Sequence, residues 1–421
     1  MIICVIGSGG REHAICKSIQ KSSKVKKIFC LPGNAGTQEL AENIDLNIDD
    51  HDELIKFLKK SKVDLVIVGP EKPLVNGITN VLENNNIKVF GPRKVPSQLE
   101  GSKTFTKEIC KKYNIPSAKF GVFETIDETL NFLKKSNFPI VIKADGLAAG
   151  KGVYISKNFQ ESKDAVKEIF GGKFGSAKKI LVEEFLNGEE MSFFIISDGK
   201  NFKVFQTAQD HKRVGEGDLG KNTGGMGSYS PSGLINKNLE SKIINKIITP
   251  TLKAINDLGE KYKGFLYAGL MISNNEPFLI EYNVRMGDPE CQTILPLLET
   301  DLVDIFIACC DEKLEKFEIK WSEKKSLCIV LCSKGYPDTF QKNVKINNLN
   351  NLAFSKNDFI FHAGTKNVKN EIFSNGGRVL NFVSVSNSFK SSRERAIKLI
   401  EQLNWENGFF RKDIGFKIID K

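Results

Sequence analysis

The sequence predicts an α/β and α+β multidomain protein in three parts: an N-terminal domain with a doubly wound parallel sheet, a central region, and a small C-terminal α+β domain. The 421 residues leave room for two to four domains with sizeable hydrophobic cores. Strand, glycine turn and helix alternate over residues 1–100, which is typical of a parallel sheet. Residues 326–421 show short strands with glycine turns and one helix. The pattern therefore predicts a central region at 101–325.

The N-terminal domain opens with a strand at Ile2–Ile6 and a glycine-rich turn. Gly7, Gly9 and Gly10 lie where the strand meets a helix, and bare backbone N–H groups at such a point can bind an anion. The turn matches a dinucleotide-binding fingerprint only in part, because Glu12 stands in place of the third glycine. The next strand ends in Pro-Gly and lacks the acidic residue that binds a ribose. A phosphate-bearing substrate is therefore favoured over NAD, and a Rossmann dehydrogenase is disfavoured.

Further glycine turns repeat this pattern within the first 100 residues. They lie in the segments Pro32–Thr37, Val63–Leu74 and Ile87–Pro92. In a doubly wound sheet the carboxyl ends of the strands meet at one edge, and ligands bind there. The sequence therefore predicts a binding site at that edge of the N-terminal domain.

The composition is that of an ordinary globular protein, 40% hydrophobic and 27% charged. No apolar run approaches the roughly 20 residues of a membrane helix. The apolar start, MIICVIGSGG, fits a buried strand better than a signal peptide. The nine cysteines include no C-x-x-C pair. We therefore expect reduced, core-filling thiols and a cytoplasmic protein.

The formal net charge of the chain is +10. Lysine is spread along the whole sequence, which favours a solvated surface over a nucleic-acid-binding stripe. A positive field would still help to attract anionic nucleotides and phosphosugars. We expect small-molecule substrates, and neither nucleic acid nor membrane as a partner.

The stretch with the clearest chemistry is FLIEYNVRMGDPECQT at residues 278–293. Its first part is a strand by composition, and side chains alternate faces along a strand, so Glu281 and Asn283 point the same way. A carboxylate and an amide oxygen side by side suit a hard divalent ion such as Mg²⁺ that also holds phosphate oxygens. Arg285 continues this face and can bind a carboxylate or phosphate as a fork, and Asp288 follows in the turn. An ordinary strand with a polar outer face explains the spacing equally well.

A helix is predicted at Gly101–Lys112, with Ser102 as its N-cap. Lys103 lies in the first turn, where the helix dipole disfavours a cation, so an anionic partner is one interpretation. Taken alone, Lys103 fits an ordinary surface lysine better.

A glycine-rich flap between antiparallel strands is predicted at Phe138–Ile155. The first strand carries Lys143, and the loop contains Gly146 and Lys151. The glycine spacing and the lack of a following Ser or Thr exclude a Walker A loop. Such a flap can close over a triphosphate, with both lysines neutralising the phosphates. A simple hairpin is the alternative.

The segment Lys179–Ser197 is predicted to hold two strands flanking a turn. A linker such as Glu183–Leu186 can clamp adenine through backbone groups, with Glu190 on the ribose hydroxyls. The alternative is a hairpin with solvated glutamates, which the spacing alone does not exclude.

The segment Gln206–Pro231 is long, polar and rich in glycine. A long loop in a compact domain is usually functional or disordered. This one concentrates Asp210, His211 and Thr223 with the run Gly224–Gly227, which favours a substrate loop. In the C-terminal domain only the GTK and GGR turns are candidates to close one wall of a site.

Taken in order, these stretches resemble the phosphoribosylamine–glycine ligases (glycinamide ribonucleotide synthetases), a family of ATP-grasp enzymes. The resemblance runs over the full length, and its most specific parts are NTGGMG at 222–227 and RMGDPECQ at 285–292. One departure is Met286, where the family usually has Phe, and Met fills similar apolar space. The other matching stretches are VIGSGGREHA, LPGNAGT, IVGPEKPLVNGI, QLEGSKTFTK, VIKADGLAAGKGV, VEEFLNGEE, QDHKRV, GFLYAGLM, FHAGTK, NGGRVL and RKDIG.

The resemblance implies a two-part ATP-grasp unit in the central region, with a lid subdomain at about 117–190. It implies that ATP, glycine and 5-phosphoribosylamine give ADP, phosphate and glycinamide ribonucleotide through glycyl phosphate, a step of de novo purine biosynthesis. It also implies a divalent cation, Mg²⁺ or Mn²⁺. We expect a monomer.

The resemblance also implies roles for individual residues. Catalytic roles fall to Arg285, Asp288 and Lys143. ATP contacts are expected from Lys103, Lys143, Gly146, Lys151, Glu183, Glu184, Phe185, Leu186 and Glu190. Contacts to the other substrates are expected from Gly9, Asn34, Glu71, Asp210, His211, Thr223, Gly225, Met226 and Arg285. The metal ligands are expected to be Glu281 and Asn283.

Two alternatives stay open at the level of activity. One is another carboxylate–amine ligase of the ATP-grasp superfamily, and the other is a carboxylase-type enzyme that uses bicarbonate. A nucleic-acid binder is suggested only by the net charge and leaves the glycine loops unexplained.

Overall fold

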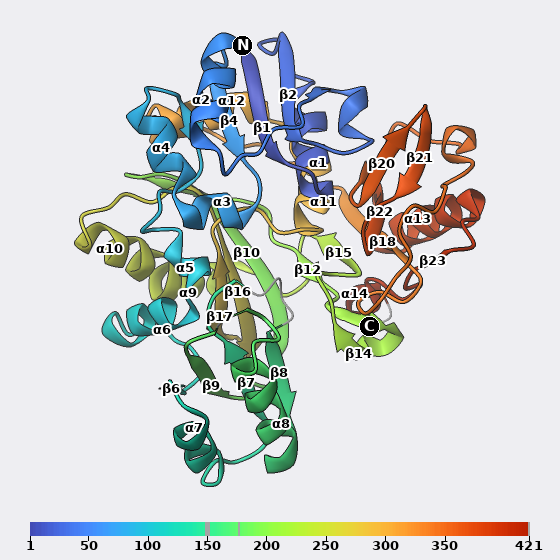
Figure 1. The fold of residues 1–421 in the computed structure, drawn as a ribbon. Helices are drawn as coiled ribbons and strands as arrows, with labels where there is room; N and C mark the ends of the chain where they lie inside the picture. Colours follow the sequence, from blue (N-terminus) through green and yellow to red (C-terminus); the bar gives the residue numbers. More distant parts are fainter. Residues whose placement is uncertain (148–151, 176, 420–421) are drawn as a thin grey trace.

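The computed structural model describes residues 1–147, 152–175 and 177–419. Figure 1 shows a parallel sheet in blue near the N-terminus, orange and red strands beside it, and green strands that extend away from both. The mixed α/β architecture and the parallel N-terminal sheet agree with the predicted fold class. None of the helices within these ranges is both long and apolar enough to cross a membrane.

The N-terminal sheet is doubly wound because its central strand sends alternate side chains to opposite faces. In β1, Ile3 and Val5 belong to the hydrophobic core that contains helix α1, whereas Cys4 and Ile6 belong to the core that contains α2 and α4. All strand pairs are parallel, in the order β3-β2-β1-β4-β5. The elements are β1 (Ile2–Gly7), α1 (Gly10–Ile19), β2 (Lys27–Pro32), β3 (Glu42–Asn43), α2 (His51–Lys60), β4 (Leu65–Val68), α3 (Glu71–Asn76), α4 (Ile78–Asn84) and β5 (Val89–Phe90).

The central region contains two antiparallel four-stranded sheets. The smaller sheet, with strands of only four or five residues, has the order β6-β9-β7-β8. It has a hydrophobic core of its own with helices α7 and α8. The larger is β11-β10-β16-β17. The elements are α5 (Gln98–Gly101), α6 (Lys103–Lys112), β6 (Phe120–Phe123), α7 (Ile126–Leu133), β7 (Ile140–Ala144), β8 (Val153–Ser156), α8 (Phe159–Phe170), β9 (Ile180–Glu184), β10 (Glu189–Asp198), β11 (Phe202–Val204), α9 (Lys237–Ile243), α10 (Thr249–Asp257), β16 (Lys263–Ser273), β17 (Glu276–Asn283), α11 (Glu290–Ile294) and α12 (Leu302–Cys310).

The strands β9 and β10 are consecutive in sequence but belong to different sheets. β9 pairs with β6 and β7, whereas β10 pairs with β11 and β16. The two strands predicted in Lys179–Ser197 are present, but they do not pair, so the alternative of a hairpin with solvated glutamates is wrong. Instead, residues 185–188 cross from one sheet to the other, so the linker spans the seam between them.

The C-terminal sheet draws two of its strands from the middle of the chain. Its order is β12-β15-β18-β22-β19, with β23 beside β18. The expectation of an irregular loop at Gln206–Pro231 is therefore wrong in part, since β12 and β15 join this sheet and β13 pairs with β14. The elements are β12 (Gln209–Asp210), β13 (Arg213–Gly215), β14 (Leu219–Asn222), β15 (Gly227–Ser230), β18 (Lys325–Ser333), β19 (Asp358–His362), β20 (Thr365–Val368), β21 (Glu371–Ser374), β22 (Arg378–Ser386), α13 (Phe389–Leu403), β23 (Gly408–Phe409) and α14 (Phe416–Ile419).

Two local predictions are confirmed. Ser102 caps α6, and its side chain accepts a hydrogen bond from the Phe105 N–H. The nine cysteines are all free thiols, and eight of them are buried.

The larger central sheet should govern the stability of the central region. Phe193 of β10 is fully buried, so Phe193→Ala should lower the free energy of unfolding by about 3–5 kcal/mol through lost burial and a cavity. Leu219→Ala is the control, because Leu219 is 69% exposed and its loss should change stability by no more than about 0.5 kcal/mol. Denaturant melts should show this difference, and equal midpoints for the two variants would contradict it.

Candidate active site

A cleft of about 700 Å³ is lined by residues from all three parts of the chain. Most of the residues expected to act on substrates line it. They are Glu71, Lys103, Lys143, Gly146, Glu183, Glu184, Phe185, Leu186, Glu190, Asp210, Thr223, Glu281, Asn283, Arg285 and Asp288. Lys151 lies outside the described residues.

The acidic strand β17 faces this cleft. A register shift against β16 makes Ile280 an extra residue, and Glu281 and Asn283 both lie half-buried on the cleft wall. Their oxygens are hard donors of the kind that Mg²⁺ and Mn²⁺ prefer. Within the described ranges no group of three or more His, Cys, Asp or Glu side chains could hold a metal ion. Glu281 and Asn283 would therefore supply only part of the ligands of such a cation.

The two described lysines of the predicted phosphate site lie close to this strand. Lys143 of β7 donates to the carbonyl oxygen of Ile280 at 3.3 Å, one residue before Glu281. Lys103 at the start of α6 donates to the carbonyl oxygen of Gly146 at 2.8 Å. Burial lowers the pKa of Lys103. The glycine turn, the helix start and β17 thus converge.

The linker between the two sheets forms another wall of the cleft. Glu183 is buried, whereas Glu184 is exposed and accepts a hydrogen bond from the Lys119 N–H at 2.9 Å. The Glu190 carboxylate lies 2.9 Å from the Lys212 ammonium, which lowers the pKa of Glu190. Of the two adjacent glutamates in this segment, only Glu184 is therefore solvated, as the hairpin alternative expected of both.

Asp210 lies on the same wall, at the end of β12. Burial raises its pKa to about 7, although the Lys212 ammonium opposes this effect. Burial thus favours the protonated form of Asp210, whereas the Lys212 ammonium favours the charged form.

Arg285 is held by two carboxylates of the chain itself. Its guanidinium donates to Glu100 at 2.6 Å and to Glu71 at 3.1 Å. Burial opposes the charge on Glu71, but Arg285 and Arg11 lower its pKa to about 2. Burial raises the pKa of Glu100 to about 7 against the pull of Arg285. The two carboxyl groups that share this guanidinium therefore have well-separated pKa values, about 2 for Glu71 and about 7 for Glu100. The expectation of a fork free to hold a substrate phosphate is not met here.

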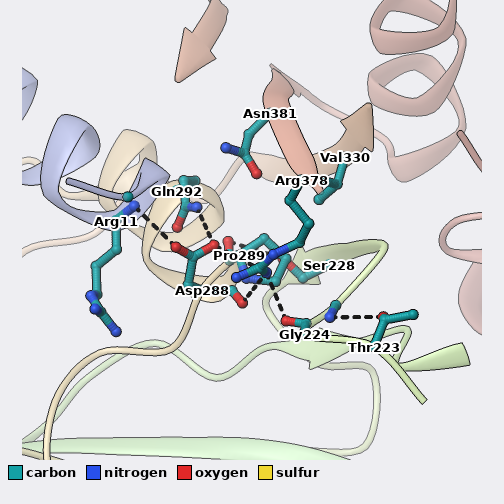
Figure 2. Close-up of polar contacts among 12 residues, drawn as sticks. Arg11, Thr223, Gly224, Ser228, Asp288, Pro289, Gln292, Val330, Arg378 and Asn381 are labelled. Carbon is teal, nitrogen blue, oxygen red and sulfur yellow. Dashed lines mark hydrogen bonds and ion pairs between the residues drawn. The ribbon is translucent and has the colours of Figure 1, made fainter. Parts of the chain in front are cut away.

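Asp288 joins the three parts of the chain (Figure 2). Its carboxylate accepts hydrogen bonds from the Arg11 N–H at 3.4 Å and the Gln292 amide at 2.8 Å, and lies 3.2 Å from the Arg378 guanidinium. Arg378 also donates to the carbonyl oxygens of Gly224 and Asp288. Burial opposes the charge on Asp288, but Arg378 and Arg11 lower its pKa. Asp288 therefore stays ionised at the point where the parts meet.

The glycine turn after β1 does not present the bare amides that the sequence suggests. The Gly9 N–H donates to the Glu12 carboxylate at 2.6 Å. The Arg11 N–H is taken by Asp288. Asn34 is buried away from the cleft lining, and its amide donates to carbonyl oxygens of Ser8 and His362. Gly9 and Asn34 thus shape the turn, and the helix end is already occupied by carboxylates.

Three other expected residues also lie off the cleft lining: His211, Gly225 and Met226. The buried His211 ring accepts from the Gly415 N–H through Nε2 and contacts Asp218 through Nδ1. Burial lowers its pKa. Met226 is fully buried against Cys332. These three residues therefore pack behind the part of Gln206–Pro231 that lines the cleft.

The site residues expected from the sequence leave out six cations of the cleft lining: Arg11, Lys107, Lys212, Arg213, Arg378 and Lys417. Lys107 lies one helical turn after Lys103, so the helix period could have placed it on the same face. Arg378 belongs to the GGR turn suspected of closing a wall. No local signal marks Arg11, because its position depends on a contact with Met286 from the central region.

Comparison with known proteins decides the family. The sequence matches the phosphoribosylglycinamide synthetase N domain over residues 1–100, the ATP-grasp (A) domain over 101–291 and the C domain over 326–417. The chain belongs to the phosphoribosylglycinamide synthetase family. It is 42% identical to a phosphoribosylamine–glycine ligase of Brucella melitensis, over 100% of this chain and 99% of that protein.

Solved structures agree with membership of the synthetase family. The crystal structure of a phosphoribosylamine–glycine ligase from Thermotoga maritima has a TM-score of 0.86 at 33% identity, over 99% of this chain and 100% of that one. A biotin carboxylase from Campylobacter jejuni, in complex with β-γ-ATP, has a TM-score of 0.74 at 14% identity, over 100% of this chain and 95% of that one. The second likeness shows the ATP-grasp fold alone.

The shared guanidinium predicts a pH dependence of stability. Because the pKa of Glu100 rises from 4.5 to about 7 on folding, the folded protein binds more protons than the unfolded chain between these values. This carboxyl group therefore makes stability fall as pH rises through that window, by about 3 kcal/mol at most. Glu100→Gln should flatten the decline in denaturant melts between pH 5 and 7. The exposed Glu108→Gln is the control, and parallel profiles for Glu100→Gln and the wild type would refute the assignment.

Proposed function

We infer that the chain catalyses ligation of glycine to 5-phosphoribosylamine, with ATP converted to ADP and phosphate. Membership of the phosphoribosylglycinamide synthetase family over all three domains carries this inference. The cleft supports it, since the buried Lys143 contacts β17, the strand that carries the oxygen donors Glu281 and Asn283. The product is glycinamide ribonucleotide, an intermediate of purine biosynthesis.

The chemistry proceeds in two balanced steps. A carboxylate oxygen of glycine attacks the γ-phosphorus of ATP, ADP leaves, and glycyl phosphate forms. The amine nitrogen of phosphoribosylamine then attacks the carbonyl carbon, and phosphate leaves as the nitrogen loses a proton. Phosphate is a far better leaving group than oxide, which is why the carboxylate is activated first. The protein's task is to hold three anionic groups together and offset their repulsion.

Lys103 and Lys143 are proposed to bind the ATP phosphates. Lys103 contacts the glycine turn at Gly146, Lys143 contacts β17 at Ile280, and neither is part of an exposed surface pair. Glu281 and Asn283 would hold a divalent cation, which when bound supplies positive charge to the phosphate oxygens. The linker Glu183–Leu186 is proposed to hold adenine.

The substrate side of the cleft is proposed to include Glu190, Asp210 and Thr223, with Glu190 on the ribose of ATP. For Arg285 we propose a changed role. Its charge is already matched by Glu71 and Glu100, so it fixes the N-terminal wall of the cleft instead of stabilising the moving phosphoryl group. This proposal replaces the fork expected from the sequence.

Three broader properties are proposals of the same kind. The domain limits are proposed at residues 100 and 325, with a lid at about 117–190. The protein is proposed to be cytoplasmic and monomeric. The segment Gly146–Gly152, of which residues 148–151 lie outside the described ranges, is proposed to close over ATP and keep water from the acyl phosphate.

Substrate dependence tests the activity directly. ADP release should require both glycine and phosphoribosylamine, and glycinamide ribonucleotide should form in equal amount by mass spectrometry. Bicarbonate in place of glycine should release no ADP. ADP release triggered by bicarbonate would instead favour a carboxylase-type reaction.

Lys143→Met tests the phosphate site. Loss of a buried cation that acts on the transferred phosphoryl group should lower kcat/KM on the order of a hundredfold or more. Lys157→Met, an exposed lysine that follows β8, is the matched control and should behave as the wild type. Near-normal kcat/KM for Lys143→Met would remove Lys143 from the phosphate site.

A further inference from the structure

Glu183 lies between two buried lysines. Its Oε2 is 2.9 Å from the Lys143 ammonium, and its Oε1 is 3.4 Å from the Lys107 ammonium. The three residues are only 2–4% exposed and come from β9, β7 and α6. All three line the cleft. This cluster, Lys107–Glu183–Lys143, therefore carries two positive charges and one negative charge out of contact with bulk water.

One lysine would suffice to compensate Glu183 as a structural ion pair. Lys143 makes the shorter contact and also donates to the Ile280 carbonyl oxygen. Lys107 has the longer contact, a 3.4 Å hydrogen bond to the Ala118 carbonyl oxygen and a position 5.6 Å from the Phe120 ring centroid. Glu183 Oε1 itself accepts no hydrogen bond within the described part of the chain. The Lys107 ammonium can therefore move closer to Glu183 Oε1 and form a hydrogen bond with it.

The second lysine matters when Lys143 turns toward a phosphate. A carboxylate left buried without its partner is strongly destabilising, so Glu183 alone would hold Lys143 back. With Lys107 in place, Glu183 keeps a counter-ion throughout. The same exchange leaves the cluster with its surplus positive charge on Lys143, at the side of β17.

We propose that Lys107 is a positioning residue. When a nucleotide binds, Lys107 becomes the ion-pair partner of Glu183, and Lys143 is then free to contact the nucleotide phosphates. The inference rests on the proposed function, in which Lys143 binds ATP phosphates. It assigns to Lys107 an indirect effect on phosphate affinity. Lys107 itself need not touch the nucleotide.

The test compares ADP and adenosine, which differ only in the phosphates. In Lys107→Met, Lys143 stays held by Glu183, so the Kd for ADP should rise about tenfold or more while the Kd for adenosine changes by less than about twofold. Lys107→Arg should keep most of the ADP affinity. Lys111→Met, one turn further along α6 and exposed, is the matched control and should change neither Kd. Isothermal titration calorimetry on the full chain measures all of these values.

A double variant separates this mechanism from simple damage to the pocket. In Lys107→Met/Glu183→Gln the neutral amide no longer holds Lys143, so the ratio of the adenosine Kd to the ADP Kd should return toward the wild-type ratio. The inference would be overturned if Lys107→Met left the ratio of the adenosine Kd to the ADP Kd unchanged, as an equal loss for both ligands would. It would also be overturned if that ratio did not recover in the double variant. If the wild type turns over glycine and phosphoribosylamine normally, these outcomes leave the proposed function standing. Absence of wild-type turnover would overturn both.

Discussion

Charge withdrawn from water must be compensated within the protein, and this constraint organises the cleft. Two of its clusters are unbalanced by one charge. Lys107 and Lys143 share one carboxylate, whereas Glu71 and Glu100 share one guanidinium. The lysine cluster can pass its surplus to an incoming phosphate. In the arginine cluster, burial and, to a lesser extent, the neighbouring Glu71 carboxylate raise the pKa of Glu100 to about 7, so this carboxyl group can lose its charge by protonation. The lysine cluster is therefore suited to binding an anionic ligand, whereas the arginine cluster is suited to fixing the N-terminal wall of the cleft.

The packing of two sheets brings the reactive groups together. Lys143 and Glu183 come from the smaller central sheet, whereas Glu281 and Asn283 come from the larger one. The hydrogen bond from Lys143 to the Ile280 carbonyl oxygen crosses between these sheets. A shift of one sheet against the other would therefore change the distance between the lysine and the oxygen pair. The linker at residues 185–188 limits such a shift, because it is a short covalent connection between the same two sheets.

The sequence predicted what depends on neighbours along the chain. The Ser102 cap, the strand at Ile2–Ile6 and the shared face of Glu281 and Asn283 follow from local sequence patterns, and the structure has all three. The partners of Arg285 could not be predicted, because Glu71 and Glu100 lie 214 and 185 positions away. A local pattern shows that a guanidinium is available, but not that carboxylates from other elements already hold it.

Glycine motifs show the same division between local and distant causes. Gly10 reads as part of a phosphate-binding turn, yet a Cβ there would lie 2.4 Å from the Asn381 amide nitrogen and 2.6 Å from that of Gln292. Gly225 has a φ of +114°, and a Cβ would lie 2.5 Å from Pro289. At both positions the absent side chain lets separate parts of the chain approach around Asp288. A glycine-rich turn in this sequence therefore serves domain contact as well as ligand access, and only the packed structure can tell the two apart.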